Sequence, residues 1–124
     1  MKKKNATPSA VRPAEPAPKK QVEITAQAMD FIFDQSPFVQ TAFMDAIHRL
    51  ESEGRLNAPL GEKVEGCDNL FEIRVRSRDG QFRTFYCYAV GNRIYILSGF
   101  VKKTQKTPRS EIRKALKIKK ELGL

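Results

Sequence analysis

The chain has 124 residues, of which 40% are apolar and 30% charged, a mix typical of one folded domain with a solvated surface. No apolar run approaches the roughly 20 residues that span a bilayer, which excludes a transmembrane helix. The net charge of +9 is uneven, because residues 1–20 carry +5, residues 21–99 carry −3 and residues 100–124 carry +7. Two basic ends around a mildly acidic body indicate an anionic partner, with nucleic acid as the first candidate. The alternative is that the cations only keep a small domain in solution.

Residues 1–20 are predicted to be a flexible basic arm. They contain four prolines, four alanines and no aromatic residue, so they cannot bury enough apolar surface to fold. The folded domain is therefore expected over residues 21–124. The segment Met1–Lys4 resembles the basic start of a signal peptide, but no apolar stretch follows it. We therefore expect a cytoplasmic protein.

Two helices are predicted in the first half of the domain. Thr25 is placed to cap the first helix through its hydroxyl group. Ser36 followed by Pro37 is a strong start for the second helix, and Gly54 is a residue type that ends helices. These signals predict a strand at residues 22–25, a helix through residue 32, a helix over residues 37–53 and a loop over residues 55–69.

Three antiparallel strands and a basic helix are predicted in the second half. Apolar and charged residues alternate over residues 71–76, and turn signals follow at residues 77–80 and at Gly91–Asn92. Thr107–Pro108 repeats the pattern of a capping residue followed by proline. The predicted elements are strands at residues 71–76, 82–90 and 93–100, a linker at residues 101–106 and a final helix.

This order of elements predicts an α+β fold. We expect a compact single domain with a small antiparallel sheet, two N-terminal helices and a basic C-terminal helix. The helices are expected to pack on one face of the sheet and to leave the other face partly open.

The residues that can carry chemistry are mainly cationic. Arg74 and Arg76 share one side of the first central strand, and Arg83 lies near the start of its hairpin partner. Tyr86 lies further along that partner, and Lys102 follows the third strand. Arginine binds phosphate bidentately, tyrosine can stack on an unpaired base, and RNA supplies its own 2′-OH nucleophile. The pattern therefore fits an RNA-cleaving site, while the alternative is a solvent-facing strand whose arginines pair with a neighbouring glutamate.

Other catalytic patterns have little support. The two cysteines, Cys67 and Cys87, are too few for a disulfide framework. With the single histidine, His48, they make a poor metal site. No phosphate-binding glycine loop is present. We therefore expect free thiols, no metal and no cofactor.

Three segments carry a resemblance to a known family. Residues 70–74 (Leu-Phe-Glu-Ile-Arg) and 81–86 (Gln-Phe-Arg-Thr-Phe-Tyr) precede residues 99–108, which contain the run Lys-Lys-Thr-Gln-Lys-Thr-Pro. Together they resemble the RelE/ParE toxin superfamily, in its HigB-like, phage-derived branch, and the resemblance covers residues 21–122. It implies a RelE-like fold. Phe82 departs from the pattern, because tyrosine is common at this position in the family.

The resemblance also implies a function. Such proteins are toxins of type II toxin–antitoxin systems that cut mRNA without a metal, often on the translating ribosome, and a helix-turn-helix antitoxin neutralises them. By matching positions, the resemblance implies that the catalytic residues are Arg74, Arg83 and Lys102, with RNA-binding roles for Lys103, Lys106, Tyr86 and Arg76. Two alternatives stay open, a ParE-like gyrase inhibitor and a non-catalytic nucleic-acid-binding module.

Overall fold

The computed structural model describes residues 20–124, which form a five-stranded sheet between two layers of helices. In chain order the elements are β2 (Gln21–Ile24), α1 (Ala26–Phe33), α2 (Pro37–Glu53), β3 (Gly61–Lys63), β4 (Phe71–Ser77), β5 (Gly80–Ala89), β6 (Arg93–Lys102) and α3 (Arg109–Glu121). The strand order is β2-β6-β5-β4-β3, with only β2 parallel to its neighbour. The predicted α+β fold with two N-terminal helices and one C-terminal helix is confirmed.

The limits of the described region bear on two predictions. The predicted arm over residues 1–20 lies outside the described residues, apart from Lys20, and stays a prediction. Within residues 20–124, none of the helices combines the length and the apolar character needed to cross a membrane.

The first two helices begin and end where their local signals predict. The Thr25 hydroxyl accepts a hydrogen bond from the Ala28 N–H at 3.1 Å and donates one to the Leu97 carbonyl at 2.7 Å. Ser36 caps α2 by accepting from the Val39 N–H at 3.3 Å. Gly54 ends α2 with a φ of 80°, a left-handed conformation that favours glycine.

The start of α3 differs from the prediction. Pro108, not Thr107, occupies the N-cap position, and no side chain caps this helix. The Thr107 hydroxyl instead donates to the Glu72 carboxylate on β4, at 2.7 Å. The prediction of a Thr-capped helix was wrong here because a buried carboxylate is a stronger hydrogen-bond acceptor for this hydroxyl than a helix end.

The predicted loop over residues 55–69 contains a short strand. β3 pairs antiparallel with β4, so that Gly61 lies opposite Ile73 and Lys63 lies opposite Phe71. Three residues are too few to show the alternation that marks a strand in a sequence, so only pairing with β4 defines this one.

A β-bulge in β6 changes which side chains face each helix layer. Tyr86 lies opposite Ile96, whereas Phe85 lies opposite Ser98, so Leu97 is the extra residue. In a regular strand, Ile96 and Phe100 would share a face because they are four residues apart. With the bulge between them, Ile96 packs against α1 and α2, while Phe100 packs on the opposite face. The bulge thus supplies Phe100 to the second core.

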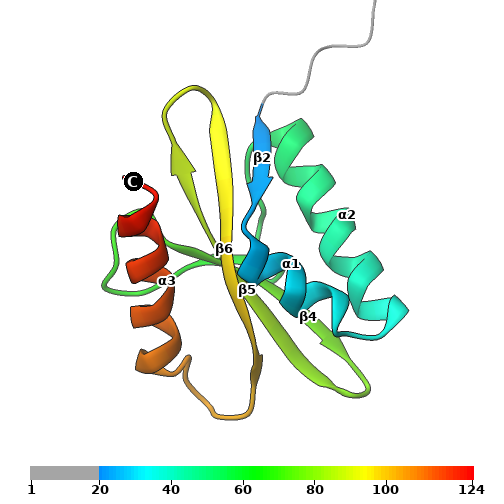
Figure 1. Ribbon diagram of the computed structural model, residues 1–124. Coiled ribbons are helices and arrows are strands. Elements are labelled where there is room, and N and C mark those ends of the chain that lie inside the picture. The colour runs from blue at the N-terminus through cyan, green and yellow to red at the C-terminus, as the bar shows by residue number, and fades with distance from the viewer. Residues whose placement is uncertain (1–19) are drawn as a thin grey trace, which may run out of the picture.

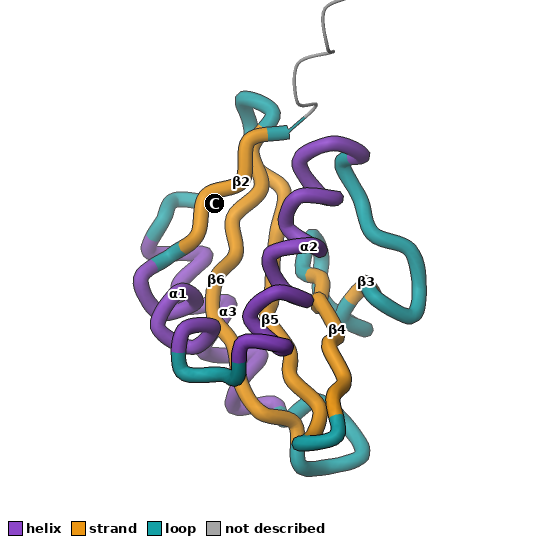
Figure 2. Tube along the Cα trace, turned by 90° about the vertical axis from the view of Figure 1, so that its right-hand side faces the viewer, coloured by secondary structure: helices purple, strands orange, loops and turns teal. Residues whose placement is uncertain are grey.

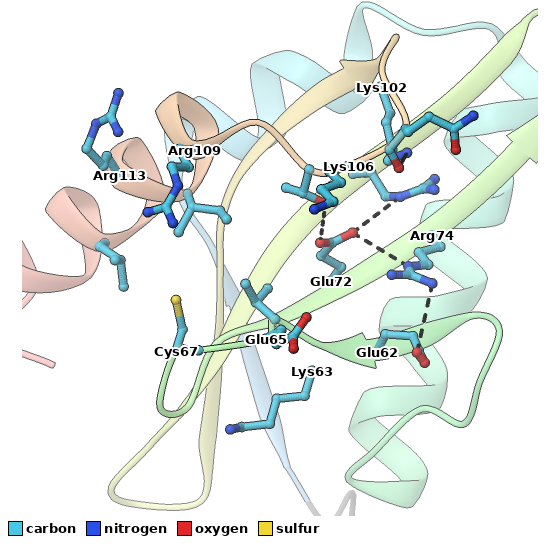
Figure 3. Close-up of a pocket in the computed structure, with 17 residues that line it drawn as sticks. Glu62, Lys63, Glu65, Cys67, Glu72, Arg74, Lys102, Lys106, Arg109 and Arg113 are labelled. Carbon is cyan, nitrogen blue, oxygen red and sulfur yellow. Dashed lines mark hydrogen bonds and ion pairs between the residues drawn. The ribbon is translucent and has the colours of Figure 1, made fainter.

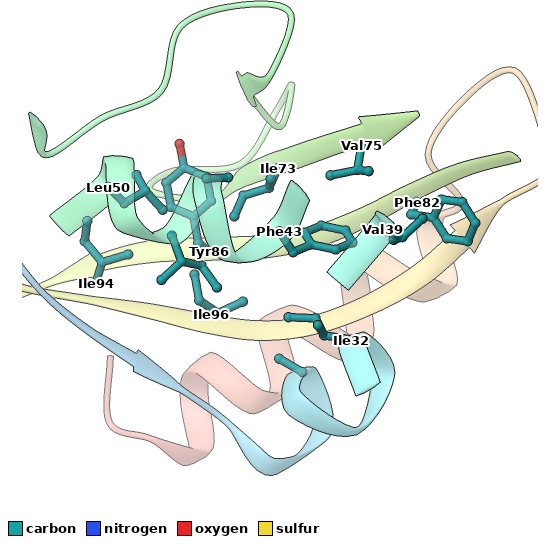
Figure 4. Packing of buried hydrophobic residues seen from close by; sticks show 13 residues of the cluster. Ile32, Val39, Phe43, Leu50, Ile73, Val75, Phe82, Tyr86, Ile94 and Ile96 are labelled. Atoms are coloured by element: carbon teal, nitrogen blue, oxygen red, sulfur yellow. The ribbon is translucent and has the colours of Figure 1, made fainter. Parts of the chain in front are cut away.

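Each face of the sheet has its own hydrophobic core. On one face, α1 and α2 bury Ile32, Phe43 and Leu50 against the sheet (Figure 4). On the other face, α3 buries Ala115 and Ile118 together with side chains from β5, β6 and the segment before β4. Figures 1 and 2 show α3 across the sheet from α2. The prediction that all helices share one face was therefore wrong, because the sheet has apolar residues to bury on both sides.

Gly99 allows α1 to approach β6 closely, and this contact makes a testable prediction. A Cβ atom at residue 99 would collide with the Phe31 ring, coming within 2.7 Å of its Cγ atom. Phe31 also packs edge-on against Phe43, which restricts its movement. We expect Gly99→Ala to lower the free energy of unfolding by about 2 kcal/mol, measured by urea titration.

A double-mutant cycle tests the cause of that loss. Phe31→Leu removes the ring that an alanine at residue 99 would meet, so Gly99→Ala should cost clearly less in its presence. Additive effects of the two substitutions would show that the loss does not come from this contact.

Candidate functional site

Two arginines lie directly opposite each other on the face of the sheet that α3 partly covers. Arg74 on β4 is the cross-strand partner of Arg83 on β5. Like charges in this position destabilise a sheet unless a counter-charge is near. Glu72 lies two residues before Arg74 and therefore points to the same face. The alternation of β4 thus places a carboxylate beside both guanidinium groups.

Glu72 connects three parts of the chain. Its Oε1 atom lies 3.3 Å from the Arg83 Nε atom and 3.6 Å from the Arg74 Nε atom, and its Oε2 atom accepts from Thr107. The Glu72 side chain is only 3% exposed and that of Arg83 8%, whereas that of Arg74 is 38% exposed. These close charges are ion pairs without a hydrogen bond through Nε. The cluster therefore has a buried anchor and one arginine open to solvent.

Arg83 is held by further contacts within its own strand. Its terminal nitrogens donate to the Gln81 side chain at 2.9 Å and to the Phe82 carbonyl at 3.4 Å. Burial lowers the pKa of the Arg83 guanidinium below its usual value; Glu72 opposes this effect, while Arg74 and Arg76 add to it. The Glu62 carboxylate also pairs with Arg74, with 3.9 Å between its Oε2 atom and the Arg74 Nη1 atom. The three arginines still outnumber these two carboxylates, so an additional anion near the cluster would be favoured.

These residues form the floor of an open cleft of about 850 Å³ (Figure 3). One wall is β3 and the loop that follows it, and the other is the segment from Lys102 into α3. We call this the cationic cleft, and it is lined by Glu62, Lys63, Val64, Glu65, Gly66, Cys67, Glu72, Arg74, Arg83, Lys102, Gln105, Lys106, Thr107, Arg109, Ile112, Arg113 and Leu116. Seven of its side chains are cationic and three are carboxylates, which gives a formal charge of +4.

Lys102 lines the cleft and is held in place by the loop that follows it. Its ammonium group donates to the carbonyl oxygens of Thr104 and Gln105, at 2.6 and 2.7 Å. Thr104 in turn donates to the Lys106 carbonyl at 2.6 Å. The Lys-Lys-Thr-Gln-Lys-Thr segment thus folds around the Lys102 ammonium, which becomes a fixed positive charge at the cleft.

The structure brings together four of the seven residues singled out in the sequence. Arg74, Arg83, Lys102 and Lys106 line the cationic cleft. Arg76 and Lys103 are exposed and do not line it.

Tyr86 does not belong to the site. It is 1% exposed in the core beneath α1 and α2, where its ring stacks on Phe71. The prediction that it stacks on an RNA base is therefore wrong. The sequence already held the signal, because Tyr86 is three residues from Arg83 in one strand and period-two alternation places them on opposite faces.

Several cleft residues were not among the site residues predicted from the sequence, and Glu72 appeared there only as the neighbouring glutamate of the alternative. The central role of Glu72 follows from strand alternation, which places it beside Arg74, although its contact with Thr107 has no local signature. Arg109 and Arg113 lie on α3, across the cleft from Arg74 (Figure 3). Their spacing of four residues places them on one helix face, but only the position of α3 turns that face toward the cleft.

Both cysteines contribute to the second core, Cys87 as a buried member and Cys67 as a half-buried residue packed against it. Both are free thiols; Cys67 lines the cationic cleft and Cys87 is buried beneath α3. Among residues 20–124, no group of three or more His, Cys, Asp or Glu side chains is arranged to hold a metal ion.

Comparisons with known proteins agree with this architecture. A family model described as phage derived protein Gp49-like (DUF891) matches residues 30–120. A double mutant of the E. coli toxin RelE in the free state superposes with a TM-score of 0.59 at 17% identity, covering 82% of this chain and 97% of that chain. A chain of the toxin–antitoxin complex RelBE2 from Mycobacterium tuberculosis gives a TM-score of 0.50 at 17% identity, covering 68% of this chain and 99% of that chain. Among proteins with curated descriptions, none matches.

Proposed function

Because the chain belongs to the Gp49-like family of phage-derived proteins and has a RelE-like fold, we propose that it is an RNA-cleaving toxin of a type II toxin–antitoxin system. The resemblance to the RelE/ParE superfamily is confirmed by this family and fold. Its substrate is mRNA, cut on the translating ribosome in the cytoplasm. The reaction needs no metal ion or cofactor.

The observation that carries this proposal is the arginine pair anchored on a buried carboxylate. Arg83 and Arg74 are held beside Glu72 on the floor of a cleft with a formal charge of +4. Fixed positive charges stabilise a phosphate whose negative charge grows in the transition state, and they need no reorganisation during the reaction. The pair is therefore suited to phosphoryl transfer.

RNA cleavage at this site uses a nucleophile from the substrate. The 2′-oxygen attacks the adjacent phosphorus and gives its proton to solvent water, while the bond from phosphorus to the 5′-oxygen breaks. The leaving 5′-oxygen takes a proton from the Lys102 ammonium group, which regains one from solvent. The products are a 2′,3′-cyclic phosphate and a 5′-hydroxyl end. Arg83 and Arg74 bind the non-bridging oxygens, and Lys102 supports the leaving 5′-oxygen.

The contacts of Lys102 favour this role over that of a base. Two of its N–H groups already donate to the Thr104 and Gln105 carbonyls, which leaves one N–H for the leaving oxygen. Lys106 lines the same wall and contacts the RNA backbone. Arg76 and Lys103, outside the cleft, add positive charge near Arg74 and Lys102 for longer RNA.

The partner of such a toxin is an antitoxin. The RelBE2 neighbour is described as a toxin–antitoxin complex, and this similarity supports a cognate antitoxin for this chain. We propose a helix-turn-helix protein, as the family resemblance implies. Its neutralising effect is tested by coexpression with the candidate gene beside this one.

Brief induction of the chain in cells, followed by primer extension on an abundant mRNA, tests the function. We expect new cuts that depend on translation and that Lys102→Ala abolishes, because this variant lacks the charge beside the leaving oxygen. Lys117→Ala is the matched control, since it removes a lysine charge at a position outside the cleft and outside the proposed RNA-binding residues. A second experiment tests the absence of a bound metal ion. The purified protein is treated with EDTA, exchanged into buffer with magnesium and then added to ribosomes, and we expect it to cleave mRNA as fast as untreated protein.

Two outcomes would contradict the proposal. Growth arrest with intact mRNA and loss of plasmid supercoiling would favour a gyrase inhibitor. Salt-sensitive RNA binding without cleavage products would favour a non-catalytic binding module.

A further inference from the structure

The wall of the cationic cleft formed by α3 carries two arginines that the proposed reaction does not use. Arg109 and Arg113 are four residues apart, on one face of the helix, and both line the cleft. Among the ion pairs of residues 20–124, none includes either arginine. Both arginines are exposed and line the cleft, and neither pairs with a carboxylate among these residues.

An apolar strip lies on the same wall. Ile112 is half-buried and Leu116 is 36% exposed, and both line the cleft beside the arginines. Within residues 20–124, no aromatic side chain lines this cleft. A base that enters it can therefore rest on aliphatic carbon or on a guanidinium plane, and not between aromatic rings.

From this arrangement we propose that α3 provides a second phosphate subsite for single-stranded RNA. Arg109 and Arg113 bind the backbone of nucleotides next to the phosphate held by Arg74 and Arg83, while Ile112 and Leu116 contact a base without reading its identity. We call the position held by Arg74 and Arg83 the inner subsite. That the phosphate bound there is the one that is cleaved rests on the proposed function, whereas the second subsite on α3 is tested by RNA binding alone.

The charges predict how binding depends on RNA length and salt. Inorganic phosphate reaches only the inner subsite, whereas a longer strand also releases counterions at α3. Each phosphate neutralised in single-stranded RNA adds about 0.7 to the slope of log affinity against log salt. Two contacts at α3 add about 1.4, so between about 50 and about 200 mM salt the wild-type affinity should fall about sevenfold more than that of a variant without them.

The test compares two double variants in fluorescence-anisotropy titrations. The probe is an RNA of about five nucleotides with every ribose 2′-O-methylated, which cannot be cleaved because the nucleophile is blocked. Arg109→Ala with Arg113→Ala should lower the salt slope by about 1.4. The control, Lys114→Ala with Lys117→Ala, removes the same charge from the same helix at positions that do not line the cleft. Alanine suits helix interiors, so both variants should fold.

We expect the arginine variant to bind the oligonucleotide more weakly and inorganic phosphate as tightly as the wild type. Equal slopes for wild type and arginine variant, or equal losses in both double variants, would overturn the proposal. It would also be overturned if the two arginines were needed for binding a polyglutamate peptide but not for binding RNA. If the wild-type protein shows this dependence of RNA binding on Arg109 and Arg113 but does not cleave mRNA, the result counts against the proposed reaction and not against the second subsite.

Discussion

Replacing Arg83 with alanine is expected to slow RNA cleavage roughly 100- to 1000-fold, as loss of one preorganised charge contact at a reacting centre typically does. Arg83 is the buried member of the arginine pair, held by Glu72, Gln81 and the Phe82 carbonyl. Its position is therefore set before RNA arrives. Single-turnover cleavage of a ribosome-bound mRNA measures the effect.

The same substitution is also expected to destabilise the fold. It leaves Glu72 buried with Arg74 as its remaining cationic partner, at a cost of about 3 kcal/mol in the free energy of unfolding. A side chain this deeply buried cannot be removed without a cost to the fold. Arg83→Ala therefore needs a second variant to separate catalysis from stability.

Combining Arg83→Ala with Glu72→Gln provides that separation. The carboxamide keeps an oxygen for the Thr107 hydroxyl and removes the buried charge that Arg83 no longer compensates. The double variant should recover most of the lost stability in urea titrations and remain inactive. Recovery of cleavage along with stability would show that Arg83 acts only through the fold.

Glu72→Ala is expected to lower the free energy of unfolding by about 3 kcal/mol, which corresponds to roughly 10–15 °C in melting temperature. Arg74 and Arg83 would then lie opposite each other without their shared carboxylate, and Thr107 would lose its acceptor. Cleavage should fall by up to about 100-fold, because the guanidinium groups lose their anchor. Thermal unfolding followed by circular dichroism measures the stability.

Two comparisons identify the cause of that loss. Thr107→Val removes only the hydroxyl contact to Glu72 and should cost about 1 kcal/mol. Inorganic phosphate at about ten times its Kd should restore about 1.4 kcal/mol to Glu72→Ala, because the anion takes the place of the carboxylate between the arginines. A variant that phosphate does not stabilise would contradict the assignment of an anion site at this pair.

The distribution of charge explains how an acidic segment contributes to a cationic site. Residues 21–99 carry a net charge of −3. The cleft whose floor is formed by β4 and β5 nevertheless has a formal charge of +4. Arg74 and Arg83 come from this acidic segment, whereas Lys102, Lys106, Arg109 and Arg113 come from the basic C-terminal one. The fold therefore brings cations from both segments together on one face, and the net charge of either segment does not reveal this.

Local signals in the sequence were sufficient for most element boundaries. Thr25 and Ser36 each cap a helix through a hydrogen bond to a residue three positions later, and Gly54 ends α2 through its own φ angle. Alternation in β4 likewise places Glu72 and Arg74 on one face. Such interactions span only a few residues, so residue type and spacing determine them.

Only the tertiary structure decided how the parts of the site meet. The bulge at Leu97 changes the facing of β6, α3 packs on the face opposite α1 and α2, and Thr107 reaches a carboxylate 35 positions earlier in the chain. Each of these depends on which apolar surfaces bury one another across the sheet. That competition is settled by the whole core, and no short stretch of residues records its result.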